Sequence, residues 1–331
     1  MTAPDEYTAQ HRDEELALED EEALQGRPYE ISAARQGGLF KELVHDTLGF
    51  VSAVFLVVLT LAAIFAPLIA PDDPNRGNLS NSMAPPVWNG GSWSNPMGTD
   101  WQGYDVLSRL LYGARTSLFI GVLVVVLAGT FGIVIGLISG YKGGRIDRWM
   151  MGWVDVQVSF PGLLLAMLLI ALVGGTVWTV AIILAINGWM VYARMTRGVV
   201  LSVRERPFVE AAEMIGSPPL RVVTKHVLPN LFTPLATLGV LEFARIILAE
   251  AALSFLGLGI QYPGVTWGLD IARAGDHELF GNQWLIIYPG LLLSLTVLAV
   301  NLLSSWLRVM LDPQEREKRY AASVSDKAGG L

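Results

Sequence analysis

One uninterrupted apolar stretch decides the class of this protein: residues 116–141 read TSLFIGVLVVVLAGTFGIVIGLISGY and contain no charged side chain. A helix rises about 1.5 Å per residue, so this stretch can cross a hydrocarbon core of roughly 30 Å. The composition agrees, because 52% of the 331 residues are hydrophobic and only 16% are charged, against about 25% in a soluble domain. The sequence therefore predicts an all-α membrane protein.

Further apolar stretches lie on both sides of this one, and no strand pattern accompanies them. Together they predict six transmembrane helices, at about 48–70, 116–141, 156–175, 176–193, 230–259 and 284–307. Gly174, Gly175 and one threonine are all that can form the turn between the third and fourth helices, so a tight hairpin is expected there.

The distribution of Lys and Arg predicts the orientation. Basic residues gather in 141–149, in 194–229 and after 308, and the loops on the other side hold fewer. Because basic loops stay in the cytoplasm, both termini and the segment 194–229 are expected to be cytoplasmic. The first apolar stretch begins near Leu48, too late for a cleavable signal peptide.

The net charge of −7 comes from one tail. Residues 1–30 hold ten acidic and two basic residues, or −8, which leaves +1 for the rest. Residues 1–38 are therefore predicted to be an acidic, disordered cytoplasmic tail. Residues 39–47 form either an interfacial surface helix or an ordinary linker. The six-span domain covers 48–311, and 312–331 form a second cytoplasmic tail.

Signatures of enzymes and metal sites are missing. The chain has no cysteine and only four scattered histidines, so neither thiolate nor histidine metal sites are expected. It has no phosphate-binding G-x-x-x-x-G-K-[ST] loop, no H-E-x-x-H and no G-x-S-x-G. We therefore expect no catalytic residue, no metal and no ATP hydrolysis by this chain alone, and nothing indicates nucleic-acid binding.

Two small-residue features within the spans allow two interpretations each. Gly132, Gly136 and Gly140 share one helix face, which favours close packing within the chain over packing against a partner subunit. Phe160-Pro161-Gly162 predicts a bend in the third span, and a static bend is favoured over a gating joint.

Three charged residues fall inside the fifth predicted span: Glu242, Arg245 and Glu250. Glu242 and Arg245 are spaced i,i+3, so they can pair on one face. Charged groups inside a bilayer are costly and indicate function by default. A structural ion pair is the favoured interpretation, and a role in lining a translocation path is the alternative.

The connection at 194–229 is much longer than a simple turn, and its residues predict a defined shape. Pro207 suits the first turn of a helix, and Gly216 suits a left-handed helix end. Ser217 can cap a second helix with Pro218 in its first turn, and that helix would end at Pro229. Two short helices at a glycine corner favour a docking element over an ordinary loop.

The same segment resembles the cytoplasmic motif of permease subunits of ATP-binding-cassette (ABC) importers. That motif is Glu-Ala-Ala, three residues, Gly and a later Leu-Pro, matched here by Glu210-Ala211-Ala212, Gly216 and Leu228-Pro229. His226 stands where Ile is commonest, as is usual in the dipeptide, oligopeptide and nickel branch. Further stretches resemble the C-type subunit of that branch: 97–115, 250–259, Trp267-Gly268 and Asp312-Pro313.

The resemblance implies a type I permease fold in a bacterial inner membrane, in contact with membrane lipid. It implies a second homologous permease subunit, two cytoplasmic ATPase subunits that use the ATP, and an extracytoplasmic substrate-binding protein. Glu210, Ala211, Ala212 and Gly216 would form the coupling loop that docks the ATPases. The implied cargo is a dipeptide or oligopeptide, with nickel or another small solute as the alternative. A secondary transporter is a third interpretation, and the residues that bind substrate are not assigned.

Overall fold

The computed structural model describes residues 42–44, 46–275 and 282–311, so the predicted tails at 1–38 and 312–331 lie outside the described residues. The chain divides into two units, Met1–Asp46 and Thr47–Leu331. Of the first unit only residues 42–44 and 46 are described, and residues 42–44 are helical. The helices that the described residues form and that are long enough to cross a membrane all belong to the second unit.

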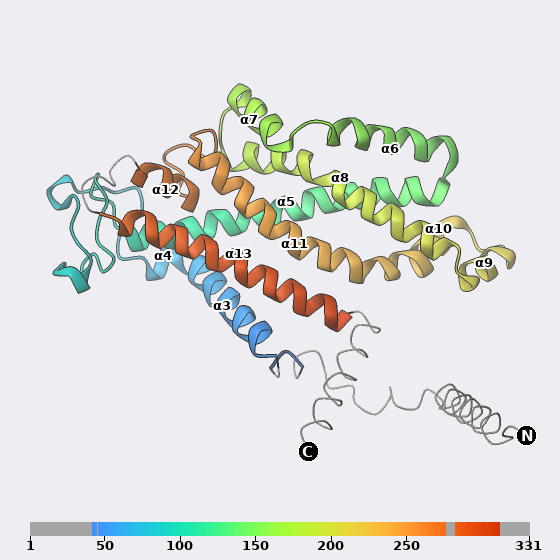
Figure 1. Ribbon diagram of the computed structural model, residues 1–331, viewed down its shortest axis with the longest axis horizontal. Coiled ribbons are helices and arrows are strands. Elements are labelled where there is room, and N and C mark those ends of the chain that lie inside the picture. The colour runs from blue at the N-terminus through green and yellow to red at the C-terminus, as the bar shows by residue number, and fades with distance from the viewer. Residues whose placement is uncertain (1–41, 45, 276–281, 312–331) are drawn as a thin grey trace, which may run out of the picture. The chain divides into compact units, whose positions relative to one another are not determined.

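Helices make up the second unit, and the described residues contain no strand beyond one isolated bridge. Figure 1 shows the longest helices running side by side. In chain order the helices are α3 (Thr47–Ile64), α4 (Ala66–Ile69), η1 (Leu79–Asn81), η2 (Val87–Asn89), α5 (Val106–Lys142), α6 (Gly144–Val158), α7 (Gly162–Val173), α8 (Val177–Arg204), α9 (Pro207–Met214), α10 (Pro219–Val222), η3 (Val223–Val227), α11 (Leu228–Phe255), α12 (Trp267–Gly275) and α13 (Trp284–Leu311).

Among the described residues, five helices are long and apolar enough to cross a membrane, namely α3, α5, α8, α13 and the helix that ends with α11. The pair α6 and α7 makes a sixth if it is taken as one bent span. The architecture is thus the predicted all-α membrane fold. Several helices are longer than the apolar stretches that predicted them, because apolar composition marks the part of a helix that lies in the membrane and not its ends.

The third predicted span, 156–175, differs most from the structure. Its first residues belong to α6, and α7 contains only 12 residues, which is about 18 Å of helix. The two helices meet at an angle of 80°. Pro161 lies between them with an extended backbone and is the N-cap residue of α7. The proline signal predicted the bend, but the continuous run of apolar residues concealed that the helix breaks.

The three glycines at four-residue spacing in α5 pack inside the chain. An added Cβ at Gly132 would lie 2.3 Å from the carbonyl oxygen of Trp189, and one at Gly136 would lie 2.5 Å from that of Ala193. At Gly140 it would lie 2.8 Å from Cβ of Val200. The glycines therefore let α5 and α8 touch backbone to backbone, as the within-chain interpretation predicted.

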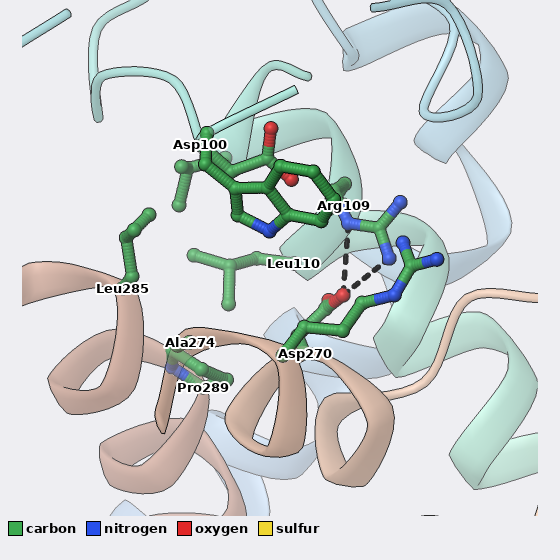
Figure 2. A pocket seen from close by; sticks show the side chains of 10 residues that line it. Asp100, Arg109, Leu110, Asp270, Ala274, Leu285 and Pro289 are labelled. Atoms are coloured by element: carbon green, nitrogen blue, oxygen red, sulfur yellow. Dashed lines mark hydrogen bonds and ion pairs between the residues drawn. The ribbon is translucent and has the colours of Figure 1, made fainter. Parts of the chain in front are cut away.

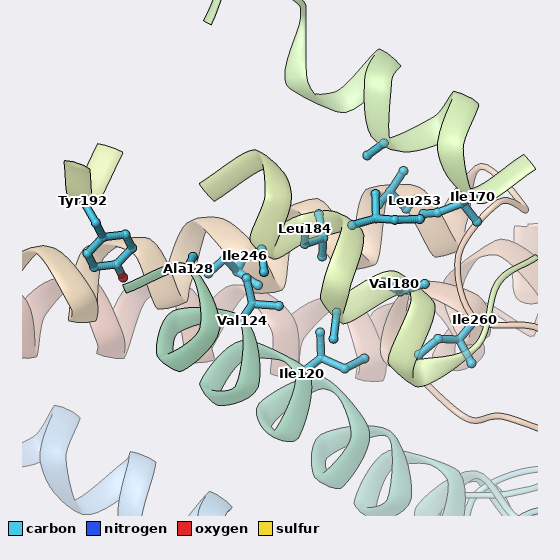
Figure 3. Packing of buried hydrophobic residues seen from close by; sticks show 14 residues of the cluster. Ile120, Val124, Ala128, Ile170, Val180, Leu184, Tyr192, Ile246, Leu253 and Ile260 are labelled. Atoms are coloured by element: carbon cyan, nitrogen blue, oxygen red, sulfur yellow. The ribbon is translucent and has the colours of Figure 1, made fainter. Parts of the chain in front are cut away.

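The largest buried cluster lies where α5, α8 and α11 meet. Ile120 and Val124 from α5, Val180 from α8 and Leu253 from α11 are all fully buried in it. Figure 3 shows these side chains interdigitating between the three helices, with Ile170 of α7 at one edge. This cluster holds α11 firmly against α5 and α8.

Candidate functional site

A sharp corner joins α9 to α10, and we call residues 205–222 the elbow. Pro207 occupies the first turn of α9, where its missing N–H costs no hydrogen bond. The helix ends at Gly216, whose φ is +82°. The N–H of Gly216 donates to the carbonyl of Glu213 at 2.9 Å, and the N–H of Ser217 donates to that of Ala212 at 3.1 Å. This is the Schellman arrangement, so glycine is required here for its backbone conformation.

The elbow is anchored to the membrane helices from inside. Val209 of α9 and Val222 of α10 are fully buried, and they pack with Val200 and Val203 at the end of α8. Tyr141, near the end of α5, donates its hydroxyl to Glu213 at 3.1 Å. The elbow is therefore held to the ends of both α5 and α8.

The four residues predicted to dock a partner do not share one environment. Glu210 and Gly216 are exposed, and Ala211 is half-buried. Ala212 is buried, 9% exposed, in the chain's own cluster with Val209. Its small side chain lets α9 lie close to α8, so Ala212 packs within this chain and is not exposed as Glu210 is.

Three large apolar side chains near the corner are exposed, and they are not among the four residues predicted to dock a partner. They are Met214 at 81%, Ile215 at 85% and Leu220 at 75% exposure. They flank Gly216, and an added Cβ there would meet no atom of the chain within 4 Å. The sequence signal that could have identified them is the presence of large apolar side chains beside a corner glycine in an otherwise polar segment. They form an apolar tip that the described part of the chain leaves exposed.

The structure corrects three predicted boundaries of this region. Helix α8 continues to Arg204, so the loop predicted to begin at 194 begins at 205. Pro218, not Ser217, is the N-cap residue of α10, and Pro219 takes the first helical position. The second helix does not end at Pro229.

Instead, α10 continues without a break into α11, which gives one helix of 37 residues, Pro219–Phe255. A π-helical turn, Val223–Val227, lies just before Pro229. A proline ring clashes with the carbonyl four residues before it in a regular α-helix, and the wider turn relieves that clash. The elbow is therefore rigidly connected to a membrane helix.

Two of the three charges of α11 form the predicted pair. Arg245 Nε donates to Glu242 Oε2 at 2.8 Å, and Nη2 lies 2.6 Å from the same oxygen. The carboxylate side chain is only 9% exposed, whereas the arginine side chain is 56% exposed. The pair thus has a buried end and an open end.

Glu250 is placed differently, because it is 1% exposed and held by hydroxyl groups. Ser254 donates to its Oε1 at 2.7 Å, and Ser117 of α5 donates to its Oε2 at 3.1 Å. It therefore ties α11 to α5 within the core. Of the three predicted residues, only Glu242 and Arg245 are brought together.

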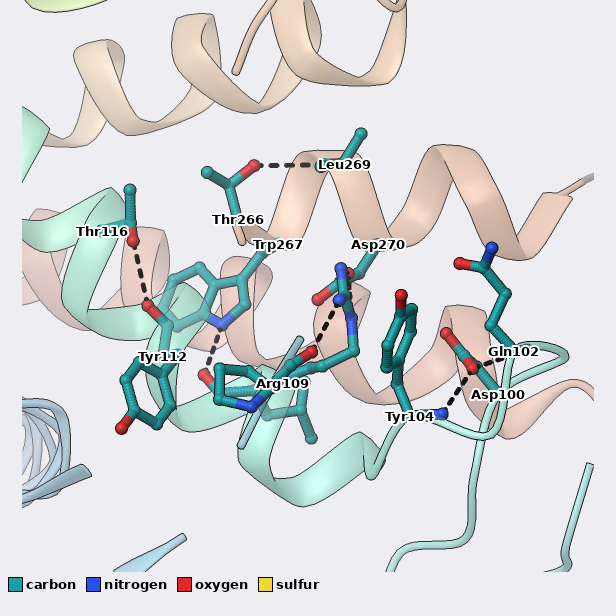
Figure 4. Close-up of polar contacts among 12 residues, drawn as sticks. Asp100, Gln102, Tyr104, Arg109, Tyr112, Thr116, Thr266, Trp267, Leu269 and Asp270 are labelled. Atoms are coloured by element: carbon teal, nitrogen blue, oxygen red, sulfur yellow. Dashed lines mark hydrogen bonds and ion pairs between the residues drawn. The ribbon is translucent and has the colours of Figure 1, made fainter. Parts of the chain in front are cut away.

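At the opposite end of the helices from the elbow lies what we call the cap, residues 71–105 together with α12 (Figure 1). Arg109, near the start of α5, holds it together. Its guanidinium pairs with Asp270 of α12, donates to the carbonyl of Pro74 at 3.1 Å and lies 5.3 Å from the ring centre of Tyr104. Trp267 is fully buried and donates to the carbonyl of Leu110 at 3.1 Å. Figure 4 shows these contacts along one side of α12.

A small cavity lies beside the Arg109–Asp270 pair, and Figure 2 shows its lining. Its volume is about 30 Å³, which is room for one or two water molecules and not for a peptide. Asp100 lines it, and burial raises the pKa of that carboxyl, although the N–H groups of Tyr104 and Gln102 that donate to it act in the opposite direction. The cavity is part of the packing of the cap.

Among the described residues no group of three or more His, Cys, Asp or Glu is placed to hold a metal ion.

Comparison with protein families gives two matches along the chain. The family described as "Binding-protein-dependent transport system inner membrane component" matches residues 132–317, which include the elbow and α11. The family described as "N-terminal TM domain of oligopeptide transport permease C" matches residues 38–86.

Individual relatives match over most of their length. The "Di/tripeptide transport system permease protein DppC" of Pseudomonas aeruginosa is 37% identical, over 83% of this chain and 91% of the relative. The "Dipeptide transport system permease protein DppC" of Bacillus subtilis is 35% identical, over 84% and 85%. The "Probable D,D-dipeptide transport system permease protein DdpC" of Escherichia coli is 34% identical, over 90% and 98%.

Proposed function

We propose that this chain is the permease subunit of an ABC importer for short peptides. The premise is that the chain belongs to the family of inner membrane components of binding-protein-dependent transport systems. The observation that carries the proposal is the elbow. It is a rigid corner with an uncovered apolar tip, continuous with a helix that crosses the membrane. Such an element passes a movement at the membrane surface into the membrane.

The elbow would dock a cytoplasmic ATPase subunit. Met214, Ile215 and Leu220 would enter an apolar groove of that subunit, because large apolar side chains at a protein surface are sites for protein contacts. Glu210 lies exposed at the start of the same corner and would add a polar contact at the rim. Gly216 would leave room for the partner, since no atom of this chain fills the space beside it.

A complete importer needs further subunits. These are a second homologous permease subunit, two ATPase subunits that bind and hydrolyse ATP, and an extracytoplasmic binding protein that delivers the cargo. This chain would then bind no cofactor and catalyse no reaction. The elbow and both termini would lie in the cytoplasm, in line with the Lys and Arg bias of the sequence.

The proposed cargo is a dipeptide or short oligopeptide. Its support is that the relatives from Pseudomonas aeruginosa, Bacillus subtilis and Escherichia coli are all described as dipeptide or di/tripeptide permeases. Nickel and other small solutes are the competing cargoes.

The test is uptake by the complete importer, purified with its partner subunits and reconstituted in lipid vesicles. Labelled dipeptide and tripeptide should accumulate only when ATP and the loaded binding protein are both present. Unlabelled peptide should compete, and Ni²⁺ should not. Accumulation of Ni²⁺ without accumulation of peptide would refute the proposed cargo and leave the transport role standing. Accumulation that does not need ATP would refute the ABC importer itself.

A further inference from the structure

Arg245 lies at mid-depth in the apolar part of the helices. Its guanidinium approaches Gly188 of α8, where an added Cβ would stand 4.0 Å from Nη2. The same Cβ would lie 3.3 Å from Cβ of Ala128 in α5. Ala128 sits in the middle of the charge-free stretch 116–141, and Gly188 sits inside another charge-free stretch, Val177–Ala193. Arg245 is therefore level with the middle of the charge-free part of α5.

At that depth the side chain is 56% exposed on the surface of this chain, so it needs a water-filled cavity or a protein partner in place of lipid. A guanidinium in contact with acyl chains is strongly unfavourable, and such groups face water-filled cavities or protein partners instead. The neighbouring groups agree. The hydroxyl of Tyr192 is buried without a hydrogen-bond partner in the described part of the chain, and both charges of the pair act on it. This level of the protein is polar although the surrounding sequence is apolar.

Glu242 holds the arginine in one orientation. Nε and Nη2 both contact a single carboxylate oxygen, so the guanidinium is anchored along one edge. Among the described residues Nη1 makes no hydrogen bond, so its N–H groups are free for an acceptor from outside the chain. An arginine fixed in this way presents a planar set of donors that fits a carboxylate.

We propose that Arg245 binds the C-terminal carboxylate of the cargo peptide during its passage through the membrane, and this proposal rests on the proposed peptide import. A carboxylate entering an apolar helix bundle needs a positive partner at mid-depth, and Arg245 supplies one there. Glu242 is the positioning residue, because it touches the guanidinium and is itself too buried to meet the cargo. The site thus selects peptides with a free C-terminus over peptides that lack the negative charge.

The test compares uptake of one peptide with uptake of the same peptide amidated at its C-terminus, in the complete reconstituted importer. Binding of both peptides to the binding protein is measured first. Uptake is then measured with the binding protein saturated by one peptide or the other, so that its affinity does not affect the maximal rate. The main variant is the double substitution Glu242→Gln, Arg245→Gln, which removes both charges without leaving a buried carboxylate unpaired. Glu242→Gln alone keeps the guanidinium, and Arg145→Gln removes an exposed arginine at the start of α6 as a control.

In the wild type, the free acid should enter faster than the amide. The double variant should lower the maximal rate for the free acid about tenfold, as the loss of one charged hydrogen bond predicts, and change the rate for the amide less than about twofold. Glu242→Gln should keep the preference for the free acid, and Arg145→Gln should behave as wild type.

An equal loss for both peptides in the double variant would overturn the proposal, because it would show that the pair supports the helices or binds a partner subunit. Unchanged uptake of the free acid would overturn it as well. A wild-type importer that carries neither peptide would instead refute the proposed cargo, so the two failures can be distinguished.

Discussion

An arginine lies against a tyrosine beside the cap and beside the elbow, yet the surroundings of the two arginines differ. Arg109 of α5, beside the cap, and Arg204 of α8, beside the elbow, both donate to a backbone carbonyl, and both lie within 6 Å of a tyrosine ring centre, at 5.3 and 5.9 Å. Arg109 is buried and completes its contacts with Asp270, whereas Arg204 is exposed. Arg109 is thus paired inside the chain, and Arg204 is not paired among the described residues.

The apolar side chains near the two arginines differ in the same way. Trp267, whose indole N–H donates to the carbonyl of Leu110 beside Arg109, is fully buried, while Met214 and Ile215 at the elbow are more than 80% exposed. The cap also exposes large side chains, Trp88 at 66% and Trp93 at 81%, so the contrast holds between the part of the cap around Arg109 and Trp267 and the tip of the elbow. Exposed apolar side chains on an ordered corner are typical of surfaces that contact another protein. Substitutions at Arg109 and Trp267 should therefore affect stability, and substitutions in the elbow should affect coupling.

The largest effect is expected for Arg109→Met. It leaves the Asp270 carboxylate buried without its partner, which costs about 3–5 kcal/mol. The matched change Arg204→Met removes an exposed arginine with similar contacts and should cost about 1 kcal/mol or less. Thermal unfolding of the purified protein in detergent measures both. Equal losses of stability would show that burial does not separate the two regions.

Gly216→Leu should have the second-largest effect. The positive φ costs a residue with a Cβ about 1 kcal/mol, and an added Cβ would meet no atom of the described, non-neighbouring residues within 4 Å. Stability should therefore fall only slightly, while uptake and substrate-stimulated ATP hydrolysis by the complete importer are lost. Gly216→Asn is the control, because asparagine tolerates the left-handed region, and it should keep most of the activity. Normal coupled transport by the leucine variant would show that the elbow does not couple.

The double change Met214→Ser, Ile215→Ser should alter stability by less than about 0.5 kcal/mol, because both side chains are already exposed. It should nevertheless weaken the binding of the ATPase subunits, measured by the fraction that copurifies with the permease in detergent. Phe119→Ser, on an exposed part of α5 far from the elbow along the chain, is a suitable control. If both variants retain the ATPases equally, the apolar tip is not their docking surface.

The last prediction concerns the side of the membrane that each region faces, and no change in stability or activity is expected. Single cysteines at Ser92 in the cap and Ser217 in the elbow should react oppositely with an impermeant thiol reagent added to intact cells. Position 92 should be labelled and position 217 should not, because the cap is proposed to face outward. Labelling of 217 from outside would reverse the proposed orientation.

The sequence predicted the membrane class and the position of the elbow because both depend on local signals. Charge-free stretches mark membrane-spanning helices, Pro207 marks the start of α9, and Gly216 follows shortly after its end. The break between α6 and α7 was only partly visible, since apolar residues continue across it. The burial of Ala212 could not be predicted, because it depends on valines of α8 that pack against it.

The cap was the least predictable region. Arg109 and Asp270 are 161 residues apart, and neither occurs in a local pattern that indicates a pair. Long-range pairs of this kind depend on how the helices are arranged, which charge and periodicity alone do not determine. Glu242 and Arg245 were predictable for the opposite reason, since their spacing of three residues places them on one face of one helix.

The unbroken helix from Pro219 to Phe255 has a mechanical consequence. From Pro219 to Arg245 is 26 residues, or about 39 Å of helix at about 1.5 Å per residue. If the helix rotates by about 10° about a point at the elbow, the guanidinium of Arg245 moves by about 7 Å. That displacement is close to two residues of an extended peptide at about 3.3 Å each. A small rotation imposed by an ATPase would thus be amplified into a displacement of Arg245 that matches the length of a dipeptide.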